Sequence, residues 1–285
     1  MPMLAPHIER LIELALDEDL GRGDVTTASV VSLGLDASAY ALAKEPLVLF
    51  GLDVAERVFE RVDARCRMLR RNKDGDALVP GDRPFEVTGT AAALLGAERT
   101  ALNFLQRLSG VATQARRYAD ACAGSKTRVV DTRKTTPGWR ALEKAAVAAG
   151  GARNHRADLA GGILIKDNHV VAAGGVAAAV ARARAQAPHP LRIEVEVKTL
   201  AELDEALAAA AEIVLLDNMG DGDVAEAVRR VAGKALIEVS GGITLERIPR
   251  LCGMGVDLIS CGALTHSARA VDLSLELELG RKAAR

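Results

Sequence analysis

From residue 128 onward, short apolar runs alternate with longer segments that are rich in alanine and charged residues. The runs that predict strands are Arg128–Asp131, Gly162–Lys166, Leu191–Val197, Ile213–Asp217, Ala235–Ser240 and Asp257–Cys261. The last four begin about 22 residues apart, close to the shortest length that holds a strand and a crossover helix. Such β–α repeats predict a parallel sheet, and this spacing favours a barrel. Because six units are visible and a complete barrel has eight, we expect an open, incomplete α/β barrel.

The first part of the chain follows a less regular pattern. Apolar residues at helical spacing between Leu4 and Ala15 predict a short helix. Strand-like stretches follow at Ala37–Ala43, Cys66–Arg71 and Phe85–Thr90, separated by turn clusters. A long amphipathic helix is predicted from near Glu98 to Cys122, within which Ser109-Gly110 is a candidate kink. We therefore expect a small α+β domain before the barrel.

Nearly every predicted barrel strand ends in polar residues, and parallel strands bring their carboxyl ends to one rim, where ligands bind. The polar ends are Asp131 through Lys134, Lys166 through His169, Asp217-Asn218 and Ser240 through Gly242. Alternation along Leu191–Val197 places Glu194 and Glu196 opposite the apolar positions, toward the barrel interior. Since an inward carboxylate is costly unless it is paired or used, this rim is the candidate site.

The rim collects an unusual number of basic side chains. They are Arg133, Lys134, His155, Arg156, Lys166 and His169, and Arg99 of the small domain is a candidate to join them. Each one alone is compatible with an ordinary surface ion pair, but the group as a whole needs a polyanion to offset its mutual repulsion. Because a buried charged group without a partner is costly, we expect a substrate that carries carboxylates.

Two acids and two glycine loops share the same rim. Glu196 and Asp217 are candidates to hold a divalent ion that bridges ligand oxygens. Ion pairs with the neighbouring lysines and arginines are the alternative, and both arrangements can occur in different ligand states. Ser240-Gly241-Gly242 and Cys261-Gly262 end the last two strands, where glycine amides can hold a phosphate. The rim thus predicts a phosphate, a metal-bound polyphosphate and a second anion as ligand parts.

Composition excludes several other classes of protein. Thirty-seven Lys and Arg balance 38 Asp and Glu, so a net charge of −1 provides no global field for nucleic acid or anionic lipid. Aromatic residues make up only 2%, which disfavours a stacking platform for single-stranded nucleic acid. No apolar run reaches the roughly 20 residues of a membrane span, and residues 1–10 show no leader pattern. Four cysteines without ligand spacing favour reduced thiols and a cytoplasmic location.

Taken together, these motifs resemble the quinolinate phosphoribosyltransferase family, the carboxylating nicotinate-nucleotide pyrophosphorylases among the type II phosphoribosyltransferases. The most specific are Asp131–Gly138 (DTRKTTPG), Asn154-His155-Arg156 and Leu164–His169 (LIKDNH). Further matches span nearly the whole chain, at Glu18–Gly21, Glu98–Asn103, Glu194–Val197, Leu216–Met219, Glu238–Ile243 and Gly262–Ser267. Departures such as Trp139 remove no charged residue from the motifs.

The resemblance implies a reaction and an architecture. Members transfer phosphoribosyl from phosphoribosyl pyrophosphate to quinolinate with Mg²⁺, giving nicotinate mononucleotide, pyrophosphate and CO₂ in NAD biosynthesis. The implied domains are an N-terminal α/β sandwich over residues 1–110, an open barrel with the active site over 111–267, and a C-terminal segment, 268–285, that packs back on the first domain. The implied assembly is a homodimer or a hexamer.

The resemblance also implies roles for individual residues. Lys134, Lys166, Glu196 and Asp217 would be catalytic, with Glu196 and Asp217 holding Mg²⁺. The implied substrate-binding residues are Arg99 (from the partner subunit), Arg133, Lys134, His155, Arg156, Lys166, Glu196, Asp217, Ser240, Gly241, Gly262 and His266. Glu194 competes with Glu196 for the role of active-site acid, because both lie on one strand face.

Three rival functions remain open at this point. The first is a relative of the same fold with a different acceptor. The second is a barrel aldolase or isomerase that forms a Schiff base through Lys166, which needs a desolvated lysine with a lowered pKa. The third is a sugar-phosphate sensor that binds ligand and releases no pyrophosphate.

Overall fold

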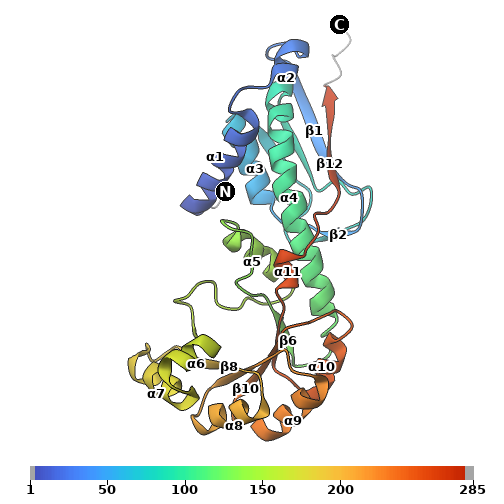
Figure 1. The fold of residues 1–285 in the computed structure, drawn as a ribbon. Coiled ribbons are helices and arrows are strands. Elements are labelled where there is room, and N and C mark those ends of the chain that lie inside the picture. The colour runs from blue at the N-terminus through green and yellow to red at the C-terminus, as the bar shows by residue number, and fades with distance from the viewer. Residues whose placement is uncertain (1–3, 280–285) are drawn as a thin grey trace. The chain divides into compact units, whose positions relative to one another are not determined.

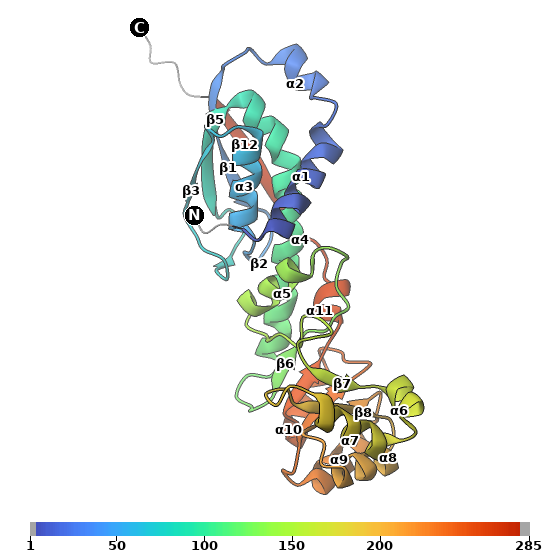
Figure 2. The same ribbon diagram turned by 90° about the vertical axis from the view of Figure 1, so that its left-hand side faces the viewer.

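The computed structural model describes residues 4–279, and the chain divides into two compact units. Residues 1–114 and 268–285 form the N-terminal unit, and residues 115–267 form the barrel unit. Figures 1 and 2 show the course of the chain in two views. The implied C-terminal segment begins with the second part of the N-terminal unit, and its residues 280–285, like residues 1–3, lie outside the described part of the chain.

The N-terminal unit is built on an antiparallel sheet of strand order β12-β1-β5-β3. Its elements are α1 (Pro6–Leu20), α2 (Val25–Val30), β1 (Asp36–Ala43), β2 (Leu47–Val48), α3 (Leu52–Val62), β3 (Arg67–Arg70), β4 (Ala77–Leu78), β5 (Phe85–Thr90), α4 (Ala91–Asp120, which continues into the barrel unit) and β12 (Leu273–Leu279). In β1, alternate alanines from Ala37 to Ala43 are buried. The apolar stripe of α3 adds Phe59, whose ring meets the edge of Phe85 at a centroid distance of 6.5 Å.

The strand β12 brings the end of the chain back to its beginning. It pairs with β1 along its whole length, from Leu273 opposite Ala43 to Leu279 opposite Ala37. Leucine alternates with serine or glutamate in this segment, which is the period of a half-buried strand. The segment's own sequence pattern therefore explains its return to the first sheet.

The helix α4 begins at Ala91, seven residues before the predicted start at Glu98, and runs without interruption through Ser109-Gly110. A Cβ on Gly110 would lie 1.9 Å from the carbonyl oxygen of Arg269, so only glycine lets residues 268–270 pass this close to the helix. Ser109 Oγ accepts the backbone N–H of Phe50 at 2.9 Å. The Ser109-Gly110 pair is thus a packing site for two other segments, and the helix continues through it.

The barrel unit confirms the predicted open α/β barrel. Its elements are β6 (Arg128–Val130), α5 (Arg140–Ala149), β7 (Ile163–Ile165), α6 (Asp167–Ala173), α7 (Val176–Gln186), β8 (Ile193–Val197), α8 (Leu200–Ala208), β9 (Ile213–Asp217), α9 (Asp221–Val231), β10 (Leu236–Ser240), α10 (Ile248–Met254), β11 (Leu258–Ser260) and α11 (Ala263–His266). All six strands are parallel, in the order β6-β11-β10-β9-β8-β7. The first and last strands of this order do not pair, so the sheet curves without closing.

Alternation along these strands separates a helix-facing side from an interior side. Val195 and Val197 of β8, like Val214 and Leu216 of β9, are fully buried under the helices that follow the outside of the sheet in Figure 1. The interleaved residues face the barrel interior, and in β8 these are Glu194 and Glu196. Each of the two acids lines a cavity of the barrel unit, in agreement with the predicted orientation.

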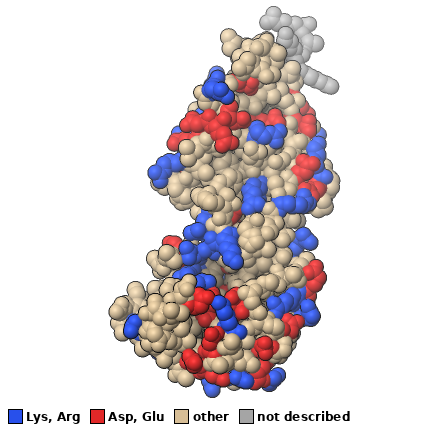
Figure 3. Space-filling model, in the orientation of Figure 1, with Lys and Arg blue, Asp and Glu red and all other residues tan. Residues whose placement is uncertain are grey.

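Within residues 4–279, no helix combines the length and the hydropathy that a membrane crossing requires. Figure 3 shows acidic and basic side chains intermixed on the visible face of the barrel unit, in keeping with the net charge of −1.

Candidate active site

A pocket of about 330 Å³ lies at the carboxyl ends of the barrel strands. It is lined by Thr132, Arg133, Lys134, His155, Arg156, Leu164, Lys166, Glu196, Leu215, Asp217, Glu238, Ser240 and Ser260. Most of the predicted substrate-binding residues are in this set. All but two of these follow or end a parallel strand, and His155 and Arg156 come from the loop between α5 and β7. The pocket thus brings together residues that are up to 128 positions apart in the chain (132 to 260).

The basic side chains of the pocket lack enough acidic partners. Arg133 Nε is buried and has no hydrogen-bond partner among the described residues. Burial and the nearby Arg133 guanidinium lower the pKa of Arg156. Lys166 Nζ, in contrast, donates to Glu196 Oε2 at 2.6 Å. A buried N–H without an acceptor is costly, so the geometry favours a ligand with anionic oxygens beside Arg133.

A buried ion pair, Lys144 with Asp131, holds the backbone of the loop that carries His155 and Arg156. Lys144 of α5 donates to Asp131 Oδ1 and to the carbonyl oxygen of His155, the latter at 2.9 Å. The same Asp131 oxygen accepts the backbone N–H of His155 at 2.8 Å. Burial raises the pKa of Asp131, and the Lys144 ammonium opposes that rise. Lys144 was not predicted, because a single lysine in an alanine-rich helix gives no signal of its own.

The two acids of β8 lie at different depths. Glu196 lines the pocket and is paired with Lys166. Glu194 is only 5% exposed and lies 3.3 Å, through Oε2, from His155 Nε2. Asp217 ends the neighbouring strand β9 and lines the same pocket as Glu196. Two carboxylates on adjacent strand ends are the hard oxygen donors that Mg²⁺ prefers.

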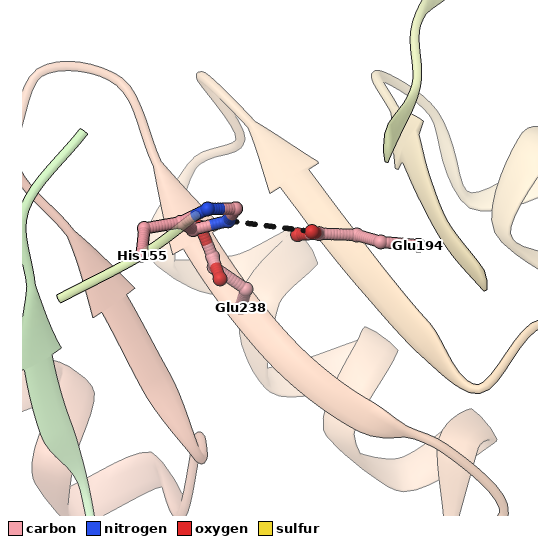
Figure 4. A group of neighbouring side chains, drawn as sticks. All are labelled: His155, Glu194 and Glu238. Carbon is pink, nitrogen blue, oxygen red and sulfur yellow. Dashed lines mark ion pairs between the residues drawn. The ribbon is translucent and has the colours of Figure 1, made fainter. Parts of the chain in front are cut away.

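Sequence reasoning did not assign a role to Glu238, which is 1% exposed in the middle of β10. Figure 4 shows Glu238 and Glu194 approaching the His155 ring from two strands. The hydrogen bond to Glu194 raises the pKa of His155, although burial of the ring opposes this. Burial and the Glu194 carboxylate raise the pKa of Glu238 to about 7. The sequence could have revealed Glu238 through strand alternation. Glu238 lies two residues before Ser240 on one strand, so both side chains face the barrel interior.

The predicted phosphate-binding residues lie around one end of the pocket. A Cβ on Gly262 would lie 3.0 Å from the His266 ring and 3.1 Å from Lys134 Cδ, so these three residues are neighbours. Gly241 has a φ of +83°, and a Cβ there would lie 2.2 Å from Asn218 Oδ1. Gly241 is therefore required at its strand end, whereas a side chain at Gly262 would need the His266 and Lys134 side chains to shift by a few tenths of an ångström.

Two predicted basic residues lie elsewhere. His169 is exposed, and its Nδ1 accepts the backbone N–H of Lys166 at the start of α6. Arg99 is an exposed residue of α4 in the N-terminal unit, 3.8 Å from Glu98. His169 does not line the pocket, and Arg99 belongs to the other unit.

Both units of the chain match models of known protein families. The model of the quinolinate phosphoribosyl transferase C-terminal domain matches residues 111–276, and that of the N-terminal domain matches residues 24–109. The chain belongs to the quinolinate phosphoribosyltransferase family. This confirms the family that the motifs predicted.

Relatives of this family cover nearly the whole chain. A Bacillus subtilis protein named probable nicotinate-nucleotide pyrophosphorylase (carboxylating) is 40% identical over 276 residues, 97% of this chain and 95% of that protein. The Mycobacterium leprae nicotinate-nucleotide pyrophosphorylase (carboxylating) is 44% identical over 272 residues, 93% of this chain and 95% of that protein. The crystal structure of NadC from Streptococcus pyogenes superposes with a TM-score of 0.92 at 42% identity, covering 98% and 99% of the two chains. These neighbours confirm the predicted fold class.

Proposed function

We propose that this protein is a decarboxylating quinolinate phosphoribosyltransferase of NAD biosynthesis. It transfers the phosphoribosyl group of phosphoribosyl pyrophosphate to quinolinate and forms nicotinate mononucleotide, pyrophosphate and CO₂. The relatives named for this reaction support the proposal across the full length of the chain. Within the structure, the observation that carries it is the buried, unpartnered Arg133 Nε in a pocket lined by four further basic side chains (Lys134, His155, Arg156 and Lys166).

The two carboxylates of quinolinate match this excess of positive charge. Arg133, Arg156 and Lys166 offer N–H donors to carboxylate oxygens, and a charged hydrogen bond is worth about 1.5–3 kcal/mol net. When the pyridine nitrogen bonds to C1 of the ribose, the C1–O bond breaks and its electron pair leaves with pyrophosphate. The resulting pyridinium then accepts the electrons of the C2–carboxylate bond as CO₂ departs, and C2 takes up one proton. The protein supplies position and charge, without a covalent intermediate.

The acidic end of the pocket suits the other substrate. Glu196 and Asp217 would hold Mg²⁺, since both are carboxylates that line the pocket from adjacent strands. Bound there, the ion would offset the charge of the leaving pyrophosphate. Lys134, Ser240, Gly262 and His266 are the neighbouring groups that would bind the ribose phosphate, and Lys166 can exchange its Glu196 partner for a substrate anion.

Assembly and location complete the proposal. Arg99, with 59% of its side chain exposed on α4, is available to enter the pocket of a partner subunit in a homodimer or hexamer. The four cysteines are free thiols, which is compatible with a reducing cytoplasm.

The rival Schiff-base reaction is disfavoured by the state of Lys166. Its side chain is 47% exposed and paired with Glu196, whereas a Schiff-base lysine needs a desolvated site that favours the neutral amine. Borohydride treatment with a carbonyl substrate should therefore leave Lys166 unmodified.

The deciding experiment measures CO₂ and pyrophosphate release from phosphoribosyl pyrophosphate, Mg²⁺ and quinolinate, with nicotinate as the parallel acceptor. Equal release of both products with quinolinate alone is expected. Pyrophosphate release only with nicotinate would show that the protein uses a different acceptor from quinolinate. Ligand binding without any pyrophosphate release would make it a sensor.

A further inference from the structure

The His155 ring has a hydrogen-bond partner at each of its nitrogens. Nδ1 accepts the backbone N–H of Arg156 at 2.7 Å, and Nε2 faces Glu194 Oε2 at 3.3 Å. Its main chain is fixed as well, through Asp131 and Lys144. A histidine held at both ring nitrogens and at its backbone N–H and C=O has one orientation.

The ring lies between two cavities of the barrel unit. The substrate pocket is on the carboxyl side of the strands, and a second cavity of about 450 Å³ opens toward their amino ends, where Arg192 and Ile213 line it. His155, Arg156 and Glu238 line both cavities, and Glu194 lines the second. The cluster of His155, Glu194 and Glu238, whose ligand atoms all lie within 4.8 Å of one another, therefore separates the two cavities.

We propose that Glu194, backed by Glu238, is a positioning residue for quinolinate recognition: it holds the His155 imidazole as the floor of the substrate pocket. This inference rests on the proposed function, since the floor matters only if a pyridine dicarboxylate binds above it. Glu194 acts through His155 and does not itself line the substrate pocket.

The hydrogen-bond geometry determines which nitrogen of the neutral His155 ring carries the proton. An amide N–H directed at Nδ1 requires a lone pair there, so the proton of the neutral ring is on Nε2, where Glu194 accepts it. Arg156 directly follows His155 in the chain. The direction of its amide N–H is therefore set by the conformation of the 154–156 loop. Without the Glu194 carboxylate, Nε2–H would be left without its acceptor and the ring would lose the contact that defines its rotation.

Charge explains why a carboxylate is placed at this depth. Arg133 and Arg156 lie close enough for Arg133 to lower the pKa of Arg156. The buried Glu194 carboxylate opposes that lowering and so stabilises the charged Arg156 guanidinium before substrate arrives. The same carboxylate repels any substrate carboxylate that moves below the ring, so quinolinate is kept at the level of Arg133.

The test compares Glu194→Gln with Glu205→Gln, a matched change at an exposed residue of α8. Steady-state kinetics should show a quinolinate KM about ten-fold or more higher in Glu194→Gln, as expected for the loss of a charged hydrogen bond. The KM for phosphoribosyl pyrophosphate should stay within about two-fold of the wild-type value, and Glu194→Asp, which keeps the charge, should recover part of the quinolinate KM. Equal rises in both KM values, or none, would overturn the inference.

A second measurement reads the tautomer in the wild-type protein itself, and a variant serves only to assign the signal. Imidazole ¹H–¹⁵N correlation spectra of the wild-type protein, with His155 assigned through His155→Gln, should show the Nε2–H tautomer at neutral pH. A proton on Nδ1 would overturn the inference. Failure of the proposed function is a separate result, because it would appear as absent turnover of quinolinate by the wild-type protein.

Discussion

The 154–156 loop lies between two buried clusters of acidic residues. The clusters differ in how many of their carboxylate oxygens have a hydrogen-bond partner. Below the backbone, Asp131 accepts from Lys144 and from the His155 N–H, and the Asn154 amide, turned with its nitrogen toward the acid, donates to Oδ2 at 2.8 Å. On the ring side, Glu194 Oε1 and Glu238 Oε1 have no hydrogen-bond partner among residues 4–279. Buried polar groups are normally satisfied, so the first cluster is complete in itself, whereas the second leaves two buried acceptors unpaired beside the pocket.

The complete cluster should give the largest effect when it is broken. Lys144→Ala leaves the Asp131 carboxylate buried without its cation, and removing one partner of a buried pair costs about 3–5 kcal/mol. Urea unfolding measures this loss. Lys126→Ala, which breaks the exposed pair with Asp257, should cost about 0–1 kcal/mol. Similar losses in both variants would remove the distinction between the loop's anchor and an ordinary surface pair.

The acidic end of the pocket should control turnover. Asp217→Asn keeps the size of the side chain but removes its charge, and we expect kcat to fall about 100-fold or more, the scale seen when one charge-stabilising group is lost. Quinolinate affinity, measured by titration, should change little because the basic residues remain. Normal turnover in this variant would take Asp217 out of the metal and ribose roles.

Glu238→Gln tests the incomplete cluster through pH. Because the pKa of Glu238 is raised from 4.5 to about 7 in the folded state, the residue is neutral and costs nothing at low pH. As the pH rises from about 4.5 to 7, the unfolded chain releases this proton while the folded protein keeps it, so the fold loses stability over that range and the loss is complete above pH 7. The glutamine variant should therefore gain stability relative to the wild type between pH 5 and pH 8, by up to about 3 kcal/mol. Urea unfolding at both pH values measures this, and Glu205→Gln should show no such trend. A constant difference between the two pH values would mean that Glu238 does not titrate in this range.

The same contrast explains what the sequence could predict. Each barrel strand lies within two residues of its predicted bounds, because apolar runs ended by polar residues are a local signal. Strand parity also placed Glu194 and Glu196 on the interior side. The partners of those acids could not be predicted in this way: Lys144 meets Asp131 and Glu238 meets His155 only after β6, α5 and β10 come together. The early start of α4 was missed because Ala91–Ala97 is nearly all apolar and gives no helical period, and β12 because its pattern was assigned only by resemblance.

Arg133→Ala tests whether the buried donor without a partner belongs to the quinolinate site. Its Nε is the buried donor that the protein leaves without an acceptor, so removing the guanidinium should weaken quinolinate binding by about 10- to 150-fold, equivalent to one charged hydrogen bond. Phosphoribosyl pyrophosphate should bind almost as before, since the residues that we propose for it are Lys134, Glu196 and Asp217. Separate calorimetric titrations of the two ligands measure both effects, and Arg182→Ala, at an exposed position of α7, is the matched control. Equal losses for both ligands would show that Arg133 supports the pocket as a whole, and that its unpartnered donor is no mark of the quinolinate site.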